Sequence, residues 1–308
     1  MTRFRKMLRA AIILATIAIG VWGIKEAIHS TPHIRWGLMD PWFIIAALFA
    51  SASQECVGTA SAQTSLAAFR HRATFARMLI ITTVATATNS VIPVPAGIPA
   101  RIWLQKSWLG IPVSCSTAAI ALEMLCGYGM LTLFALAGTF WFGGNTFALG
   151  LRYLPVFVVT AALVLLMAWL FRRTLQTWIR QLIALRPALL PTYGIIGLNV
   201  LVIALATLRL WLILHAMGDG AASIAQITAA LCIARVAGVA SMIPMGLGSR
   251  DITLAGLLVV SGVALPIAAL AAAVDRVLST APYLTVALIG WPLLRRPSAI
   301  NNHGDTAQ

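Results

Sequence analysis

The chain has 308 residues, of which 60% are hydrophobic and only 10% are charged. An ordinary soluble domain has about 25% charged residues, so this composition excludes a water-soluble fold and predicts an integral membrane protein. The net charge of +14 would suggest a nucleic-acid partner in a soluble protein, but cytoplasmic loops of membrane proteins also collect Lys and Arg. We therefore expect no nucleic-acid partner.

Six apolar segments are long enough to span a membrane as helices, which takes about 20 residues. They cover residues 8–24, 41–62, 115–141, 150–171, 193–217 and 267–294. The first follows a basic start, as a signal peptide would, but no small-residue cleavage site follows it, so we interpret it as a retained helix. We expect an all-α fold with residues 1–296 as a single transmembrane domain and 297–308 as a disordered cytoplasmic tail.

Two further pairs of shorter apolar segments are interrupted by proline and glycine. The pairs are 77–92 with 98–112 and 223–244 with 250–262. The hinge residues are Pro93, Pro95 and Gly97 in the first pair and Pro244, Gly246 and Gly248 in the second. Because lipid cannot satisfy a broken backbone, each pair predicts a broken or re-entrant helical hairpin that faces the protein interior. The alternative is an ordinary loop between two short full spans.

The order of the segments predicts an internal repeat. Each proposed unit consists of a span, a broken pair and a second span, over about 41–141 and about 193–294. The first unit enters its hairpin from the cytoplasm and the second enters from outside. The two units therefore form an inverted-topology repeat, an architecture in which transporters place paired broken helices around a midplane site.

The distribution of basic residues predicts the orientation. With the N-terminus inside, the inner side receives Arg3, Arg5, Lys6, Arg9, Arg70, Arg72, Arg77, Arg101, Lys106, Arg172, Arg173, Arg180, Arg186, Arg295 and Arg296. The outer side receives Lys25, Arg35 and Arg152. This excess predicts that both termini are cytoplasmic. Treating the broken pairs as full spans gives the same orientation.

Several ionisable side chains fall within apolar segments, where each costs at least about 2.5–3.5 kcal/mol to insert. They are Glu55, Glu123, Arg209, Arg235, Asp275 and Arg276, with Arg250 and Asp251 at the second hinge. One interpretation is a polar centre that binds a headgroup or carries protons. The alternative is structural ion pairing, for instance of Glu123 with Arg235 or of Asp275 with Arg250. We expect Arg209 to reach outward to the membrane surface.

A substrate-binding set follows from the first interpretation. Its members are Asn89, Arg101, Glu123, Arg250, Asp251, Asp275 and Arg276. Arg101 could hold a phosphate with a bidentate fork, and Arg250 opens a helix after the glycine hinge, where anions are favoured. Asp251 could simply cap that helix, and Asn89 could bond freed carbonyls at the first hinge. We predict that Arg250, Arg276 and Glu123 face one interior cavity.

The sequence does not favour an enzyme. No HExxH or similar ligand spacing is present, and no GxSxG, P-loop or dinucleotide-binding motif occurs in the required context. We therefore expect no catalytic residue, metal or cofactor.

At the hinges the sequence resembles the lysylphosphatidylglycerol synthase transmembrane-region family over about residues 40–294. The family's first signature matches Asn89, Pro93, Gly97 and Arg101, with Ile98 in place of its acid. A later Glu-Arg pair matches only at Glu123, because Met124 replaces the Arg. The second signature matches Pro244, Gly246, Gly248, Arg250 and Asp251, with Asp in place of Glu, and is followed by Arg276 and Pro282.

The resemblance implies a protein of the inner (plasma) membrane that moves or handles polar lipids. We expect a flippase-like transporter of a polar, anionic or phosphate-bearing lipid, whose partners are the membrane, the lipid or lipid-linked amphiphile, and a separate synthase or glycosyltransferase. Aminoacyl transfer is not expected of this chain alone. The alternative is a membrane-embedded enzyme or accessory subunit acting on lipid-linked sugars or aminoacyl-lipids, with Asp275 or Glu123 as base.

Overall fold

The computed structural model describes residues 40–91, 96–143, 187–241 and 248–294, together with Gln176 and Gly246. Within these residues the fold is helical and contains no strand, which confirms the all-α class for them. In chain order the helices are α2 (Pro41–Ala68), α3 (Phe75–Val91), α4 (Gly97–Leu109), α5 (Val113–Gly143), α8 (Leu189–Ala216), α9 (Ile224–Ala240), α10 (Ser249–Val260) and α11 (Leu265–Leu294). The predicted spans 8–24 and 150–171 and the predicted tail lie outside the described residues.

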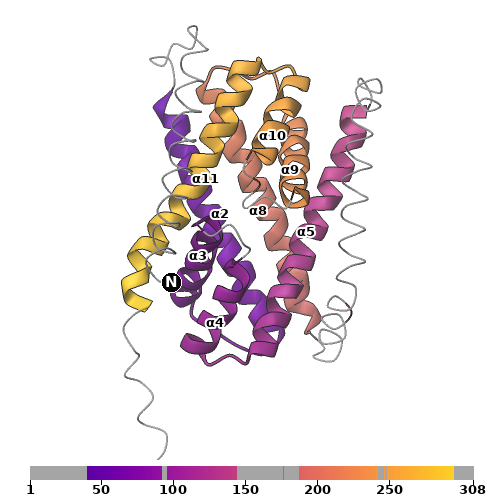
Figure 1. Cartoon of the computed structure of the whole chain (residues 1–308). Helices are drawn as coiled ribbons and strands as arrows, with labels where there is room; N and C mark the ends of the chain where they lie inside the picture. The colour runs from indigo at the N-terminus through magenta and orange to yellow at the C-terminus, as the bar shows by residue number, and fades with distance from the viewer. Residues whose placement is uncertain are drawn as a thin grey trace, which may run out of the picture.

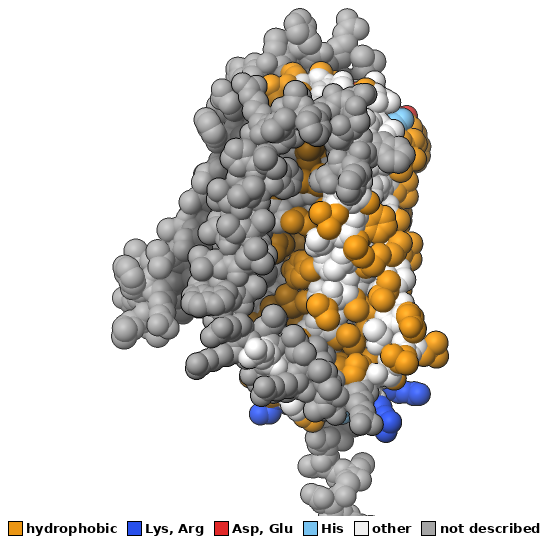
Figure 2. All heavy atoms as spheres, turned by 90° about the vertical axis from the view of Figure 1, so that its right-hand side faces the viewer, with side chains coloured by type: hydrophobic (Ala, Val, Ile, Leu, Met, Phe, Trp, Pro, Cys, Tyr) orange, Lys and Arg blue, Asp and Glu red, His pale blue; other side chains and the backbone are white. Residues whose placement is uncertain are grey.

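Four of the described helices, α2, α5, α8 and α11, are long and apolar enough to cross a membrane. Their apolar stretches run over 26 or 28 residues, against the roughly 20 that a bilayer requires. They coincide with four of the predicted spans. Hydrophobic side chains cover much of the middle of the face in Figure 2, and Lys and Arg appear at its lower end. The chain is therefore a multi-pass membrane protein.

The four remaining helices are short. They have 17 residues in α3, 13 in α4, 17 in α9 and 12 in α10. At about 1.5 Å per residue the longest reaches about 26 Å, less than the thickness of the hydrocarbon core. Their bounds follow the four short segments predicted from the sequence. In Figure 1 the α3–α4 pair lies toward the lower end of the bundle and the α9–α10 pair toward its upper end.

Local sequence signals set the ends of these helices. A capping box opens α9, where the Ser223 hydroxyl accepts from the Gln226 N–H and the Gln226 side-chain oxygen accepts from the Ser223 N–H. Gly110 closes α4 with a positive φ of 66°, a conformation that favours glycine. The same chemistry ends a helix in water or in a membrane, so these boundaries follow from the sequence.

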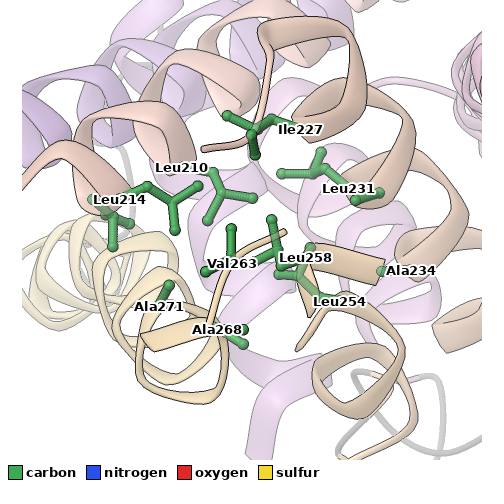
Figure 3. Close-up of a cluster of buried hydrophobic side chains, with 14 of the residues drawn as sticks. Leu210, Leu214, Ile227, Leu231, Ala234, Leu254, Leu258, Val263, Ala268 and Ala271 are labelled. Carbon is green, nitrogen blue, oxygen red and sulfur yellow. The ribbon is translucent and has the colours of Figure 1, made fainter. Parts of the chain in front are cut away.

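Packing joins helices that are distant in the sequence. α2 and α8 lie along each other at the centre of the bundle, while α5 packs on α9 and α11 packs on α3. A buried apolar cluster holds α8 to the α9–α10 pair and to α11 (Figure 3). Its labelled members are Leu210, Leu214, Ile227, Leu231, Ala234, Leu254, Leu258, Val263, Ala268 and Ala271. The second hairpin is therefore anchored to two long helices by apolar contact.

Two pairs of helices pack closely at a glycine, α5 on α9 and α11 on α3. A Cβ added at Gly138 of α5 would meet the Cβ of Ala229 on α9 and lie 3.0 Å from its Cα. A Cβ added at Gly290 of α11 would lie 2.7 Å from the Cγ2 and 3.0 Å from the Cγ1 of Ile80 on α3. In both cases the obstacle is held close to the backbone of the facing helix, because Ala229 has no further side-chain atoms and Ile80 is branched at Cβ.

We expect Gly138→Ala to lower the free energy of unfolding by about 1–3 kcal/mol, because the Ala229 backbone cannot move aside without separating α5 from α9. Gly129→Ala, on the same helix, is the matched control, since both changes improve helix propensity equally but a Cβ at Gly129 would meet no atom within 4 Å. Denaturant unfolding of the purified variants in detergent measures both effects. An equal or larger loss of stability at Gly129 would contradict the role of close packing at Gly138.

Candidate functional site

Asp275 is the centre of a buried charge cluster. This residue of α11 has no exposed surface, and each carboxylate oxygen accepts from a different arginine. Oδ1 accepts from Nε of Arg209 on α8 at 2.8 Å, and Oδ2 accepts from Nη2 of Arg250 on α10 at 2.5 Å. One carboxylate thus joins three helices. The pairing of Asp275 with Arg250 is the structural alternative that the sequence left open.

Arg209 is buried, which corrects the expectation that it reaches outward. Only 1% of its side chain is exposed, and its Nη1 donates to Gln54 Oε1 at 2.6 Å and to Ser51 Oγ at 3.3 Å. Both acceptors lie on α2. The outward expectation was wrong because Arg209 lies where α8 packs between α2 and α11, and Asp275 compensates its charge. Its Nη2 is buried and has no hydrogen-bond partner.

A second ion pair lies directly beside the first. Arg276 donates from Nε to Oδ1 of Asp251 at 3.2 Å and from Nη2 to Oδ2 at 2.7 Å, a bidentate geometry. Its Nη2 also lies 3.3 Å from the carbonyl oxygen of Gly246 in the second hinge. Consecutive residues of α10, Arg250 and Asp251, thus pair with consecutive residues of α11. This crossed arrangement ties the start of α10 to the middle of α11.

The first half of the chain contains a simpler pair. Arg101 of α4 donates from Nη2 to Oε2 of Glu123 on α5 at 2.6 Å, and both side chains are partly exposed. The expected alternative partner of Glu123 was Arg235, and the structure places Arg101 there instead. The Nε of Arg101 is buried without a hydrogen-bond partner. Met124 occupies the position after Glu123, whereas Arg276 follows Asp275, so this pair has no neighbouring second pair.

The first hinge is closed by Asn89 and Gly97. The Asn89 side-chain oxygen accepts from the Gly97 N–H at 3.4 Å, so it satisfies a freed donor rather than a freed carbonyl. A Cβ at Gly97 would lie 2.7 Å from the Ala85 carbonyl oxygen, which explains why glycine begins α4. Pro93, Pro95 and Pro244 lie outside the described residues.

The structure thus brings together part of the predicted set. Arg250, Asp251, Asp275 and Arg276 form one group with Arg209, which we call the second-half cluster. Arg101 and Glu123 form their own pair on α4 and α5. Arg209 and its partner Gln54 were not predicted from the sequence as members of this cluster. The polar stretch Ser51 to Glu55, which follows the apolar first part of α2, was the available signal.

Two further features bear on the chemistry. In the described part of the chain, no group of three or more His, Cys, Asp or Glu is arranged to hold a metal ion. A surface pocket of about 410 Å³ lies at the end of α2, lined by Ala67, Arg70, Arg72 and Pro191. Its two arginines are exposed, and it belongs to the basic end of the bundle rather than to the second-half cluster.

Comparison with known proteins identifies the family. No curated protein matches the chain. The family described as "Lysylphosphatidylglycerol synthase TM region" matches residues 7–287, which include both hairpins, both ion-paired groups and most of α11. The match extends N-terminally beyond the region in which the hinge motifs suggested a resemblance. Since it covers most of the sequence, the chain belongs to the lysylphosphatidylglycerol synthase transmembrane-region family.

Proposed function

We propose that the chain is a flippase-like transporter that moves a polar, anionic or phosphate-bearing lipid between the leaflets of the inner (plasma) membrane. The second-half cluster is the observation that carries this proposal. It connects the broken pair α9–α10 to the long apolar helices α8 and α11. Charged groups within membrane helices are costly and mark substrate pathways. Membership of a family named for a lipid synthase supports a role in lipid modification or movement.

An inverted repeat is the architecture that we propose for this transporter. In such a repeat α2, α3, α4 and α5 correspond to α8, α9, α10 and α11, so each helix contact should have a counterpart between the corresponding helices. The observed contacts agree: α5 packs on α9 and α11 on α3, α4 packs on α5 and α10 on α11, and α2 packs on α3 and α8 on α9. The contact between α2 and α8 joins the two corresponding central helices. In Figure 1 the two hairpins lie at opposite ends of the bundle, as re-entrant elements of opposite orientation would. This pattern supports a pseudo-two-fold axis between α2 and α8.

Individual side chains support the same relation. Glu123 and Asp275 are 152 residues apart, and so are Gly138 and Gly290. Each acid pairs with an arginine on the second helix of the hairpin in its own half, α4 for Glu123 and α10 for Asp275. Each glycine packs against the first helix of the hairpin in the other half, α9 for Gly138 and α3 for Gly290. On the central helices α2 and α8, residues 148 positions apart correspond, so Ser61 corresponds to Arg209 and Ser51 to Asn199. Both cross-pairs are hydrogen-bonded, Asn199 to Ser61 and Arg209 to Ser51.

The proposed mechanism is exchange of ion-pair partners. The headgroup enters between the broken pairs, near Arg101, Glu123, Arg250 and Arg276, while its acyl chains stay in lipid. Without a headgroup, Asp251, Asp275 and Glu123 compensate the arginines and keep them in the membrane at a tolerable cost. An anionic group replaces an acid as partner of Arg250 or Arg276, which lowers the cost of carrying that group across hydrocarbon. Both termini are cytoplasmic in this proposal, as the basic residues predict.

Arg250→Gln tests the proposal. In liposomes with a fluorescent phospholipid and a membrane-impermeant quencher, we expect the wild-type chain to accelerate exchange between leaflets. Arg250→Gln is expected to reduce the rate about tenfold or more, because it removes charge-assisted hydrogen bonds. Its fold is expected to persist, because Asp275 keeps Arg209 as a partner. Arg77→Gln, at an exposed position in the first turn of α3, is the charge-matched control. A variant at position 250 that moves lipid at the wild-type rate would leave the cluster with a purely structural role.

The alternative is an enzyme or accessory subunit that acts on lipid-linked sugars or aminoacyl-lipids. Both oxygens of Asp275 accept from guanidinium groups, which disfavours Asp275 as the base. Glu123, which accepts from Arg101 through Oε2, is the base that this alternative would use. Thin-layer analysis of the reconstituted lipid separates the two, since an enzyme yields a new chemical species and a transporter changes only the distribution between leaflets.

A further inference from the structure

Arg235 of α9 lies beside the second-half cluster but does not pair with it. Gly238, one turn later on the same face, lies so close to α10 that a Cβ there would be 3.1 Å from the Cβ of Arg250. The charges of Arg250, Arg209 and Asp275 act on the Arg235 guanidinium. Arg235 nevertheless forms no hydrogen bond or ion pair with the described residues, and its side chain is partly exposed.

The acids near this arginine leave positive charge uncompensated. Both oxygens of Asp275 are occupied by Arg209 and Arg250. Glu55 on α2 is within electrostatic reach of Arg209 and Arg235, but hydrogen bonds to neither. With the Arg276–Asp251 pair included, four guanidinium groups therefore face three carboxylates, those of Glu55, Asp251 and Asp275. The buried Nη2 of Arg209 adds a donor without an acceptor. An anion with several acceptor oxygens would satisfy both the charge and the donor.

The first half contains no such excess. In the proposed repeat, residues of α3 and α9 that are 149 positions apart correspond, as Ile80 and Ala229 do, so Arg235 corresponds to Thr86. On α2 and α8 the separation is 148 positions, so Arg209 corresponds to Ser61. Two neutral hydroxyl residues thus stand where the second half has two arginines. At the place that corresponds to the Arg250–Asp275 pair, the first half has the Arg101–Glu123 pair, in which one cation faces one acid. The two halves share a backbone plan but differ in charge.

We propose that Arg235, Arg250 and the free Nη2 of Arg209 form a single phosphate-binding site in the second half of the chain. The ligand is a phosphomonoester or phosphodiester group, from a lipid headgroup or from free phosphate. The inference rests on the proposed function and deepens it, because it names the recognised group and assigns it to one half. Arg235 becomes a ligand-binding residue, which neither the hinge motifs nor the ion pairs include.

Binding to the full-length chain in a phosphate-free maltoside detergent tests the site. The probes are short-chain phosphatidylglycerol, diacylglycerol of the same chain length and inorganic phosphate, with affinity measured by calorimetry or thermophoresis. We expect phosphatidylglycerol to bind and diacylglycerol not to bind. Binding of phosphatidylglycerol without inorganic phosphate assigns the site to a lipid headgroup, and equal binding of both assigns it to free phosphate. Equal binding of diacylglycerol would overturn the site.

Variants at position 235 supply the decisive comparison. Arg235→Gln is expected to weaken phosphatidylglycerol binding by about tenfold to a hundredfold, while the thermal midpoint stays unchanged or rises. Arg235→Lys keeps the charge and is expected to bind more tightly than the Gln variant. Arg77→Gln is expected to bind as the wild type does. Wild-type affinity in Arg235→Gln, or a Lys variant no better than Gln, would overturn the proposal.

The phosphate site and the transporter function can be refuted independently of each other. A wild-type chain that binds phosphatidylglycerol through Arg235 but does not exchange lipid between leaflets keeps the phosphate site and refutes the transporter. A chain that exchanges lipid while Arg235→Gln leaves binding unchanged keeps the transporter and refutes the phosphate site.

Discussion

Asp275→Asn is expected to lower the free energy of unfolding by about 3–5 kcal/mol, the largest loss from any single substitution in the second-half cluster. Asp275 is buried and compensates Arg209 and Arg250 together, so its replacement leaves two guanidinium groups facing each other within the bundle. The amide has one acceptor oxygen instead of two and carries no charge. Denaturant unfolding of the purified protein in detergent, followed by circular dichroism, measures the loss.

Glu123→Gln is the matched control for this prediction. In the inverted repeat that we propose, Glu123 is the counterpart of Asp275. Glu123 has one arginine partner, Arg101, and the side chains of both residues are partly exposed. We expect a loss of about 1 kcal/mol, because solvent screens the arginine that remains. A further comparison combines Asp275→Asn with Arg209→Gln, which removes one of the uncompensated charges and should recover part of the stability. Equal losses at the two acids would contradict the central role of Asp275.

Gly246→Ala is expected to destabilise the second hinge by about 3 kcal/mol. Gly246 has a positive φ of 61°, which costs an L-residue about 1–2 kcal/mol. A Cβ at this position would also lie 2.8 Å from the Cα of Gly238 on α9, so the hinge would have to move away from that helix. The Gly246 carbonyl, which accepts from Arg276, would move with it. We therefore expect lipid exchange and stability to fall together.

Gly110→Ala separates the two contributions to that loss. Gly110 also has a positive φ, of 66°, in the left-handed region, but a Cβ there would meet no atom within 4 Å. Only the backbone strain remains, so we expect about 1–2 kcal/mol from this substitution. Unfolding of both variants under the same conditions gives the difference. A loss at Gly110 as large as that at Gly246 would mean that close packing on Gly238 contributes little.

The same side chains contribute to stability and to the transport that we propose. Arg250, Asp251, Asp275 and Arg276 hold the start of α10 against α11, and they are also the groups that we propose to meet a headgroup. A headgroup that binds one of these arginines replaces its acidic partner. The ion pair between α10 and α11 is then broken, which weakens the contact between the two helices. Ligand binding and hinge position are therefore expected to be coupled.

Several features of the candidate site were accessible from the sequence. Proline and glycine at the hinges, with charged residues directly after them, indicated Arg101 and the Arg250–Asp251 pair. The similar depth of Glu123 and Asp275 in their segments predicted that they are counterparts, as the proposed repeat requires. Inference from the sequence failed for Arg209, since position within an apolar helix does not show whether a side chain meets lipid or protein. Its partners lie 66 residues away at Asp275 and 155 residues away at Gln54.

The sequence by itself determined the membrane class and the bounds of the described long and short helices. These features depend on composition, on the length of apolar runs and on residues that cannot continue a helix, all of which act locally. Only the tertiary structure decided which acid compensates which arginine, that Glu123 meets Arg101, and that Asp275 holds both Arg209 and Arg250. Those pairings depend on which faces of distant helices meet, and that is set by side-chain packing across the whole bundle.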